Sequence, residues 1–322
     1  MRRSIAVIAL ALLLVFSFAP CLNAEPSTVR VSVHVNDIQQ VSLRTHSFYA
    51  DMYIGFRWSD PTLRPAKTIT WMNPYQYWAL ITRFMADEPI RLPNGDLFEW
   101  IRVRGEFNVT LPLHDYPFDR QLLVAEFEDR ASPRSRLEHH AEAISLANDL
   151  VTPGYEIGAA KLLVTTVPGL GAVQTLTGQS TEGFTRVRIE IPARRPFLVY
   201  FIKLALPLLL VTACNALALL LPARLVEARI GLGITSLLVM VALHISLNTD
   251  LPEIDYLMRL DKLYLISYLF GFGTLASMAW TTRRHIDDLT TEAVRRECLW
   301  SLLGLVVMYV CLVTVALTVS RT

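Results

Sequence analysis

Cysteine is scarce in this sequence, and a long part of the chain has none. The 322 residues include four cysteines, Cys21, Cys214, Cys298 and Cys311. Cys21 lies in an apolar N-terminal run and the other three lie after residue 195, so residues 25–195 contain no cysteine. Any fold in that region must therefore hold together without a disulfide.

Charged residues and catalytic motifs are also scarce. Charged residues make up 18% of the chain and the formal net charge is +1, a balance that disfavours nucleic acid as a partner. The sequence contains no glycine-rich phosphate loop, no His-Glu-x-x-His metal motif and no serine nucleophile elbow. We therefore expect no enzymatic activity, no catalytic residue and no cofactor.

One group of potential metal ligands lies at residues 138–142, where His139 and His140 stand beside Glu138 and Glu142. Side chains of adjacent residues point in different directions, which favours a solvated loop over a metal site. We expect no resident metal ion there, and weak modulation by divalent cations stays open.

The N-terminus has the pattern of a secretory signal. Two arginines precede an apolar run over residues 5–19, and small residues lead to Ala24. This pattern predicts a signal peptide over residues 1–24 that is cleaved near Ala24. Cys21 suggests a lipoprotein site, but the residues before it, 18–20, fit that pattern poorly. We therefore expect export of the domain that follows.

Residues 25–195 show the two-residue alternation of half-buried strands, as in Val29, Val31, Val33 and Val35. Further strands are predicted at residues 48–58, 98–111, 121–127, 161–167 and 184–191. Residues 75–86 fit either a short helix or an aromatic-rich loop. Many short strands without a long helix predict an antiparallel, immunoglobulin-like β-sandwich over residues 25–195.

After residue 195 the composition changes to four apolar stretches long enough to span a bilayer. They predict a four-helix transmembrane domain over residues 196–322, with helices at about residues 197–221, 227–249, 260–282 and 294–319. Arginines gather in the first and third connecting loops, and acidic residues gather in the second. The positive-inside rule therefore places the N-terminal domain and the C-terminus on the outer side.

The second of these stretches has a polar stripe on one side. At about 100° per residue, seven residues fall on one narrow face of the helix. They are Glu227, Gly231, Thr235, Leu238, Ala242, Ile245 and Thr249, and we call them the stripe. Such a face either lines water or packs its small residues against a partner helix. Periodicity alone leaves both interpretations open.

Three features of the sequence resemble one family, the prokaryotic branch of the pentameric ligand-gated ion channels, or Cys-loop receptors. Residues 109–123, centred on Tyr116-Pro117-Phe118-Asp119, are similar to the signature loop of that family. Val109 and Leu123 stand where animal members have the cysteines of the loop disulfide. The spacing from Arg195 to Pro207, and Leu251-Pro252 after the second stretch, are similar as well.

The resemblance implies five identical subunits in a lipid bilayer, with the stripe of each second helix lining a central pore. A ring of five Glu227 carboxylates at the cytoplasmic mouth would concentrate cations. We therefore expect selectivity for monovalent cations. Leu238 and Ile245 are the candidate gate, because an apolar constriction closes by dewetting.

The resemblance also implies a mechanical junction between the sandwich and the helices. It assigns this junction to Tyr116, Pro117, Phe118, Asp119, Arg195 and Pro252. We expect the Asp119 carboxylate to pair with the Arg195 guanidinium, since a partly desolvated ion pair is worth more than an exposed one.

The agonist site that the resemblance implies lies between subunits, with Tyr53 on one face and Glu128, Arg130 and Phe184 on the other. In members activated by amines, an aromatic box holds the cation. Tyr53 and Phe184 fit such a box. Arg130 would repel an amine unless Glu128 neutralises it, and it suits a carboxylate.

Protons are the other candidate agonist. His114, Asp115, His244 and Glu128 are the groups that would titrate usefully if they are buried. The leading prediction is a homopentameric, cation-selective, ligand- or proton-gated channel. It would be a multi-pass protein of a bacterial inner membrane, with the N-terminal domain and the C-terminus in the periplasm. An anion-selective channel of the same fold, and a membrane-anchored periplasmic binding or sensor protein without conductance, stay open as alternatives.

Overall fold

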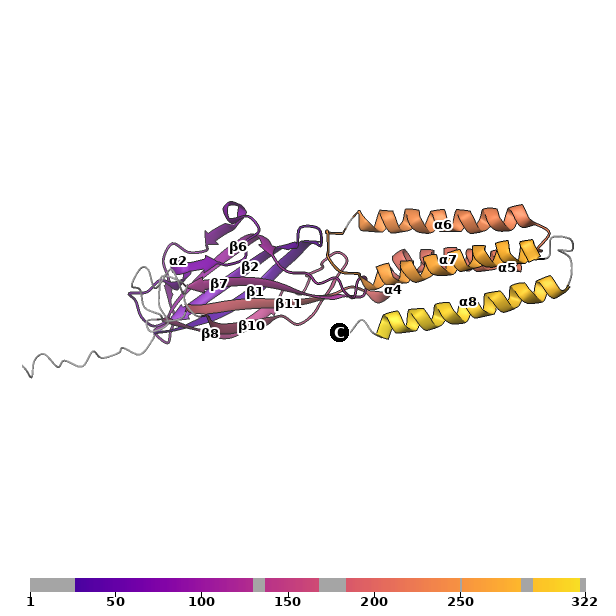
Figure 1. Ribbon diagram of the computed structural model, residues 1–322. Coiled ribbons are helices and arrows are strands. Elements are labelled where there is room, and N and C mark those ends of the chain that lie inside the picture. The colour runs from indigo at the N-terminus through magenta and orange to yellow at the C-terminus, as the bar shows by residue number, and fades with distance from the viewer. Residues whose placement is uncertain (1–26, 130–136, 168–183, 250, 285–291, 319–322) are drawn as a thin grey trace, which may run out of the picture.

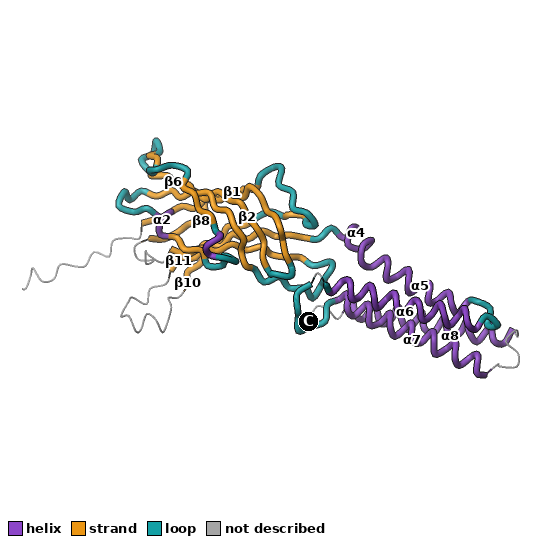
Figure 2. The backbone as a smooth tube through the Cα atoms, turned by 90° about the horizontal axis from the view of Figure 1, so that it is seen from above, coloured by secondary structure: helices purple, strands orange, loops and turns teal. Residues whose placement is uncertain are grey.

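The computed structural model describes residues 27–129, 137–167, 184–249, 251–284 and 292–318. A β-sandwich and a bundle of long helices lie end to end along one axis (Figure 1). Figure 2, turned by 90°, shows the same division between the strands and the helices. The predicted signal peptide and Arg130 lie outside the described residues.

The sandwich consists of two sheets. The first has the order β4 (Ile81–Phe84), β6 (Leu97–Asn108), β2 (Ser47–Trp58), β1 (Ser27–Ser42) and β8 (Leu137–Leu146), with β5 (Ile90–Arg91) also on β6. The second has the order β10 (Lys161–Val167), β11 (Phe184–Arg194), β7 (Arg120–Asp129) and β3 (Ile69–Trp71), with β9 (Glu156–Ile157) also on β11. The predicted β-sandwich is confirmed, but β1 and β8 pair in parallel.

The core between the sheets comes from the alternating residues. The four valines of β1 at positions 29, 31, 33 and 35 are buried, as the period of two requires. The rings of Trp71 and Phe127, from the second sheet, have centroids 5.3 Å apart. Trp71 also meets Phe107 of the first sheet at 5.1 Å. These aromatic contacts join the two sheets without a disulfide.

Two segments differ from the sequence prediction. Residues 137–146 form strand β8 and not the solvated loop that the histidines and glutamates suggested. Residues 75–86 contain a short 3₁₀ turn, η1 (Tyr77–Ala79), and the edge strand β4, whose four residues are all exposed. An edge strand with both faces exposed has no reason to alternate, so its sequence carries no strand period.

The helical domain begins with a span in three parts, α4 (Phe197–Tyr200), the π-helical η2 (Phe201–Ala205) and α5 (Leu206–Leu220). Pro207 lies at the start of α5, where it removes a backbone hydrogen bond, and the π-helical turn η2 directly precedes this helix. The other helices are α6 (Val226–Asn248), α7 (Arg259–Arg284) and α8 (Glu292–Thr318). The described residues therefore include four spans long and apolar enough to cross a membrane, as predicted. A separate short helix, α2 (Pro65–Thr68), lies in the sandwich.

In Figure 1, α5 and α7 lie between α6 and α8. α6 packs against α5 and α7. α8 has only Val294 and Cys298 buried. α6 therefore occupies one side of the bundle, and α8 is left facing the surroundings on the other.

Candidate functional site

Helix α6 packs within the chain through one face only. The buried residues are Arg229, Gly233, Ser236, Met240 and Leu247. A Cβ atom at position 233 would lie 2.5 Å from Cδ2 of Leu275 on α7, so a side chain there would displace that of Leu275, and glycine allows the close approach of the two helices without such a shift. This face fixes the rotation of α6 within the bundle.

The stripe lies on the opposite, open face of α6. All seven of its residues are exposed in the single chain. Leu238 and Ile245 each expose 64% of their surface, and a Cβ atom at Gly231 would meet nothing within 4 Å. The small residues of the stripe therefore do not pack against helices of the same chain. This excludes packing against a helix of the same subunit and leaves packing against another subunit, or the lining of water.

The polar groups on the open face are a negative charge and hydrogen-bond acceptors. Glu227 is exposed in the first turn of α6, whereas the guanidinium of Arg229 is turned inward. Nε of Arg229 donates to the Ala218 carbonyl at 3.2 Å and Nη2 to Cys298 Sγ at 3.3 Å. The hydroxyl of Thr235 donates to the Gly231 carbonyl at 2.8 Å, so its oxygen retains a lone pair to accept with. The open face thus offers acceptors and a carboxylate.

The junction between the domains holds the ion pair expected from the sequence. Nε of Arg195 lies 2.8 Å from Oδ1 of Asp119, and the two side chains are only 5% and 2% exposed. Gln121 also donates to Asp119. Asp119 precedes β7 and Arg195 follows β11, where the chain turns toward the first span. The contact is present, and its role in gating stays a prediction.

A cage of tyrosines surrounds the Arg195 guanidinium. Its carbon lies 5.1 Å from the ring centroid of Tyr116 and 4.7 Å from those of Tyr155 and Tyr200. Nη2 also donates to the Tyr155 hydroxyl at 2.6 Å. Burial opposes the charged guanidinium, but the Asp119 carboxylate and the tyrosines hold the pKa of Arg195 above its usual value. Burial raises the pKa of Tyr155, so its hydroxyl keeps its proton.

The signature loop also contacts the connection between α6 and α7. The backbone nitrogen of Leu113 donates to the Tyr256 hydroxyl at 2.9 Å, and His114 stacks on the same ring at 3.8 Å between centroids. Arg259, the first residue of α7, has its Nε 2.9 Å from the Asp115 carboxylate. Its backbone nitrogen donates to the His114 carbonyl at 3.0 Å.

Apolar packing completes this junction. Leu113 and Tyr116 of the loop belong to one buried cluster with Leu247 of α6, Leu251 of the α6–α7 connection and Met258. Pro252 lies beside this cluster and is half-buried. Pro117 is buried in the loop. The loop therefore shares a buried cluster with the C-terminal end of α6.

Phe118 makes the remaining contact of the signature loop. Its ring lies 4.7 Å from that of Phe197 at the start of α4. The sequence analysis did not find Tyr256, Arg259 or Phe197, because nothing in their local pattern distinguishes them from ordinary helix-end residues. Their roles come from partners more than 70 positions away in the chain.

The proposed agonist residues lie on different sheets. Tyr53 belongs to β2 of the first sheet, whereas Glu128 on β7 and Phe184 on β11 belong to the second. Glu128 is 2% exposed, and the Arg186 guanidinium lies 2.5 Å from it. The Arg102 guanidinium lies over the Tyr53 ring, with its carbon 5.1 Å from the centroid. One chain therefore does not bring these residues together.

The groups considered for proton sensing have defined partners. His244 faces α7, where its ring stacks on Tyr264 at 4.5 Å. Its nitrogens lie 3.2 Å from the Tyr268 hydroxyl and 3.3 Å from the Asp261 carboxylate. The next residue along α6 is Ile245 of the stripe, so His244 links α7 to the part of α6 that carries the candidate gate.

The histidines and glutamates at 138–142 alternate along β8. His139 is 2% exposed and lies against Phe127, with ring centroids 6.4 Å apart, whereas the His140 side chain is 52% exposed. Within the described ranges, no group of three His, Cys, Asp or Glu side chains is placed to hold a metal ion. The strand sends the two histidines to opposite faces, as the pleat requires.

Known proteins resemble this chain over most of its length. A gamma-aminobutyric acid receptor subunit beta-4 from Gallus gallus is 23% identical over 279 residues, covering 81% of this chain and 56% of that protein. An acetylcholine-gated chloride channel subunit from Caenorhabditis elegans is 25% identical over 281 residues, covering 79% of this chain and 61% of the relative. A gamma-aminobutyric acid receptor subunit pi from Rattus norvegicus is 24% identical over 295 residues, covering 86% and 65%.

No protein-family model matches the chain. The chain spans between 56% and 65% of the length of these three relatives. The matched region nevertheless includes parts of both the sandwich and the helices, because it covers 79% of the chain or more. The resemblance to the Cys-loop receptor superfamily that the motifs indicate is thus supported by similarity to subunits of ligand-gated channels.

Proposed function

We propose that this chain is the subunit of a homopentameric ligand- or proton-gated ion channel in a lipid bilayer, of the prokaryotic type without a loop disulfide. The observation that supports this function most directly is the open face of α6. On this face the carboxylate of Glu227, the threonine hydroxyls and Gly231 are not covered by other described parts of the chain. In a transmembrane helix such groups need a partner or water. Five copies around an axis give each stripe a water-filled lumen.

Orientation follows from the loops. Export of the sandwich places the α5–α6 connection and Glu227 on the cytoplasmic side, and the junction with the sandwich on the periplasmic side of an inner membrane. Leu238 and Ile245 then form the apolar rings above Glu227, and dewetting between them closes the lumen.

The pore is selective for cations in this proposal. Among the seven residues of the stripe, Glu227 is the one that carries a charge, and Arg229 is 1% exposed and directed toward α5 and α8. Five carboxylates at one mouth raise the local concentration of cations by about tenfold or more. The hydroxyl oxygens of Thr235 and Thr249 add acceptors along the wall.

An anion-selective channel is the second candidate, because one relative is by name a chloride channel. Selectivity depends on a few residues of α6, and overall identity of 25% does not fix them. The two candidates therefore differ in which ion sets the reversal potential of the current.

The test is the current across a bilayer that contains the purified pentamer, recorded in a sodium chloride gradient while pH is stepped and agonists are added. Reversal near the sodium equilibrium potential supports the cation channel. Glu227→Gln should reduce the sodium-to-chloride permeability ratio by about tenfold. Glu292→Gln removes a carboxylate from the same end of the bundle but from α8, and it should leave the ratio unchanged.

Reversal of the unmodified channel near the chloride potential would establish the anion-selective alternative. Absence of current at every pH and with every agonist, from an intact pentamer, would favour the membrane-anchored binding or sensor protein.

The agonist of this channel carries a carboxylate and is not a simple alkylamine. The Tyr53 ring, which would receive an amine, already has the Arg102 guanidinium over it at 5.1 Å. Arg83 lies opposite Arg102 in the β4–β6 register, and Arg104 lies two residues further along β6. The Asp51 carboxylate is a counter-charge to these three guanidiniums and lies 2.6 Å from Arg102 and 3.0 Å from Arg104.

Two of the relatives described above are subunits of receptors for gamma-aminobutyric acid by name, and that ligand carries a carboxylate. The test compares short amino acids with alkylamines that lack their carboxylate. The acids should open the channel, and Arg102→Gln should raise their half-maximal concentration about tenfold, the loss of one charge-assisted hydrogen bond. Arg57→Gln, in the ion pair between β2 and β8, is the matched control. Activation by the amines alone would contradict this assignment.

A further inference from the structure

Helices α6 and α7 contact each other through two leucine side chains, each of which lies on a glycine of the other helix. A Cβ atom at Gly271 of α7 would lie 2.6 Å from Cδ2 of Leu237 on α6, and the equivalent contact joins Gly233 of α6 to Leu275 of α7 at 2.5 Å. In each helix the glycine and the leucine are four residues apart, so they share one face. We call these four residues the clasp. Its glycines bring the two helices close together.

The clasp also reaches a third helix at Gly271. A Cβ atom there would lie 3.3 Å from Cγ of Leu237, the branch point of that side chain, and 2.9 Å from Nδ2 of Asn215 on α5. Asn215 is fully buried, and its Oδ1 accepts a hydrogen bond from the Thr274 hydroxyl at 2.5 Å. Its Nδ2 has no hydrogen-bond partner among the described residues. Side chains of α5 and α6 therefore meet at Gly271, and the one from α5 is held by α7.

The clasp lies on the side of α6 that faces away from the stripe. Gly233 is about 200° around the helix from Gly231 of the stripe, at about 100° per residue. Leu237 directly precedes Leu238 of the candidate gate. A group that pushed Leu237 away from α7 would therefore move Leu238 toward the open face, which lines the lumen in the proposed channel.

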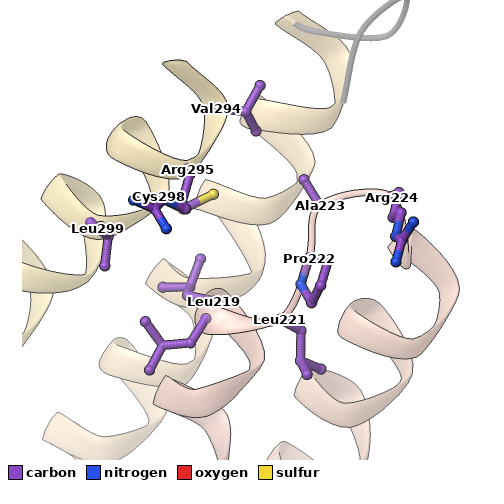
Figure 3. A pocket seen from close by; sticks show the side chains of 10 residues that line it. Leu219, Leu221, Pro222, Ala223, Arg224, Val294, Arg295, Cys298 and Leu299 are labelled. Atoms are coloured by element: carbon purple, nitrogen blue, oxygen red, sulfur yellow. The ribbon is translucent and has the colours of Figure 1, made fainter. Parts of the chain in front are cut away.

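Packing is looser at the end of the bundle remote from the sandwich. A cavity of about 590 Å³ lies there, lined by the end of α5, the α5–α6 connection and the start of α8 (Figure 3). The lining residues that the structure describes include none of α6 or α7. Toward the sandwich, α6 meets α7 through longer side chains, since His244 stacks on Tyr264 at 4.5 Å between ring centroids. The clasp between these two regions therefore sets the separation of α6 and α7.

We propose that Gly271 is a positioning residue for the gate, because the space above it accepts Leu237 and so holds Leu238 back from the axis of the lumen. This inference rests on the proposed function, since the lumen exists only in the pentamer. A methyl group at position 271 would overpack the contact, and overpacked contacts respond by shifts of side chains and backbone. Since Asn215 is held by Thr274, the shift falls on Leu237 and moves α6 toward the lumen.

The experiment measures how fast a thiol at position 238 is labelled in the purified pentamer. Leu238→Cys is made in a protein whose two exposed cysteines, Cys214 and Cys311, are replaced by serine, and the same protein with Leu238 intact gives the background. A charged methanethiosulfonate reagent is added, and labelling is followed by mass spectrometry of the intact chain. Gly271→Ala should slow labelling by about fivefold or more, because overpacking narrows the ring. Adding Leu237→Ala should restore the rate, and Leu237→Ala alone should raise it.

Gly273→Ala is the matched control on the same helix. A Cβ atom at Gly273 would lie 2.7 Å from Cδ2 of Leu305 on α8, so the added methyl group crowds a leucine to a similar degree but does not touch α6. Gly271→Ala and Gly273→Ala should lower the thermal unfolding temperature by similar amounts. Labelling should slow in Gly271→Ala alone, which separates positioning of the gate from general packing.

An unchanged labelling rate in Gly271→Ala, or equal slowing in Gly273→Ala, would overturn the proposal. A slow rate that Leu237→Ala does not restore would overturn it as well. If Gly271→Ala does not assemble, a rate unaffected by Leu237→Ala alone overturns it. These results leave the proposed function standing when the unmodified protein carries current, whereas an intact pentamer without current at every pH and with every agonist contradicts the proposed function and this inference together.

Discussion

Replacing Asp119 with asparagine should destabilise the sandwich and weaken its connection to the helices. The substitution preserves shape but removes the charge that faces Arg195. The guanidinium then remains 5% exposed with the Tyr155 hydroxyl and three tyrosine rings as its partners. These partners solvate a cation only in part.

The magnitude follows from burial. Breaking a buried ion pair by removing one partner costs about 3 to 5 kcal/mol, and the retained tyrosine contacts place this case near about 3 kcal/mol. A nearby pair provides the control, since Arg194 and Glu156 also lie 2.8 Å apart but are 59% and 55% exposed. Glu156→Gln should therefore cost less than about 1 kcal/mol.

The assay is urea unfolding of the detergent-solubilised protein, followed through the buried tryptophans Trp58 and Trp71. Asp119→Asn, Arg195→Gln and the double variant form a double-mutant cycle. The double variant should be less destabilised than the sum of the single ones by about 2 to 3 kcal/mol, because it leaves no uncompensated charge.

The same variants test the role of the pair in gating, because agonist-evoked current should require higher agonist in Asp119→Asn than in Glu156→Gln. Additive single effects, or equal losses for Asp119→Asn and Glu156→Gln, would refute the reasoning.

Two further predictions concern the pore and the sandwich. The candidate gate is tested by Leu238→Ser and Ile245→Ser. The substitution at the closed barrier should raise the leak current without agonist, because a ring of hydroxyls stays hydrated. Equal leak currents from both variants would mean that the two rings share the barrier. For His139, burial lowers the pKa to about 4 from 6.5, so the unfolded state takes up a proton first as pH falls. Stability should be constant above pH 6.5 and fall by about 3 kcal/mol by pH 4. His139→Phe should remove this fall in thermal unfolding followed against pH, and an unchanged slope would show that other groups cause it.

Strands that alternate were predictable from the sequence, and so were the apolar helices. β10 has the predicted bounds, Lys161–Val167, and the valines of β1 are buried as expected. Strand β8 was not predictable, because four consecutive residues from position 140 to 143 are exposed. A strand at the end of a sheet lacks the one-sided burial that produces a period of two.

The open face of α6 was also predictable from periodicity, since most residues of the stripe are smaller or more polar than most of the residues on the other sides of the helix. Contacts between distant segments were predictable only where a motif pointed to them, as for Asp119 and Arg195. The Asp115–Arg259 pair and the Glu128–Arg186 pair join segments without such a motif. Side-chain pairing across the fold depends on register and rotation, which local periodicity does not encode.

In the proposed channel, the two attachments of α6 together predict where it moves. Its far end is held by Arg229, which is buried and bonded to α5 and α8. Its near end, at Leu247, shares a buried cluster with Leu113 and Leu251, so displacement of the signature loop acts there first. Leu238 and Ile245 lie about 16 and 27 Å along the axis from Glu227 at about 1.5 Å per residue. A helix held at one end and displaced at the other tilts, and its displacement grows with distance from the fixed end. We therefore infer that gating widens the Ile245 and Leu238 rings while the Glu227 ring keeps its diameter, so that selectivity and opening reside at opposite ends of one helix.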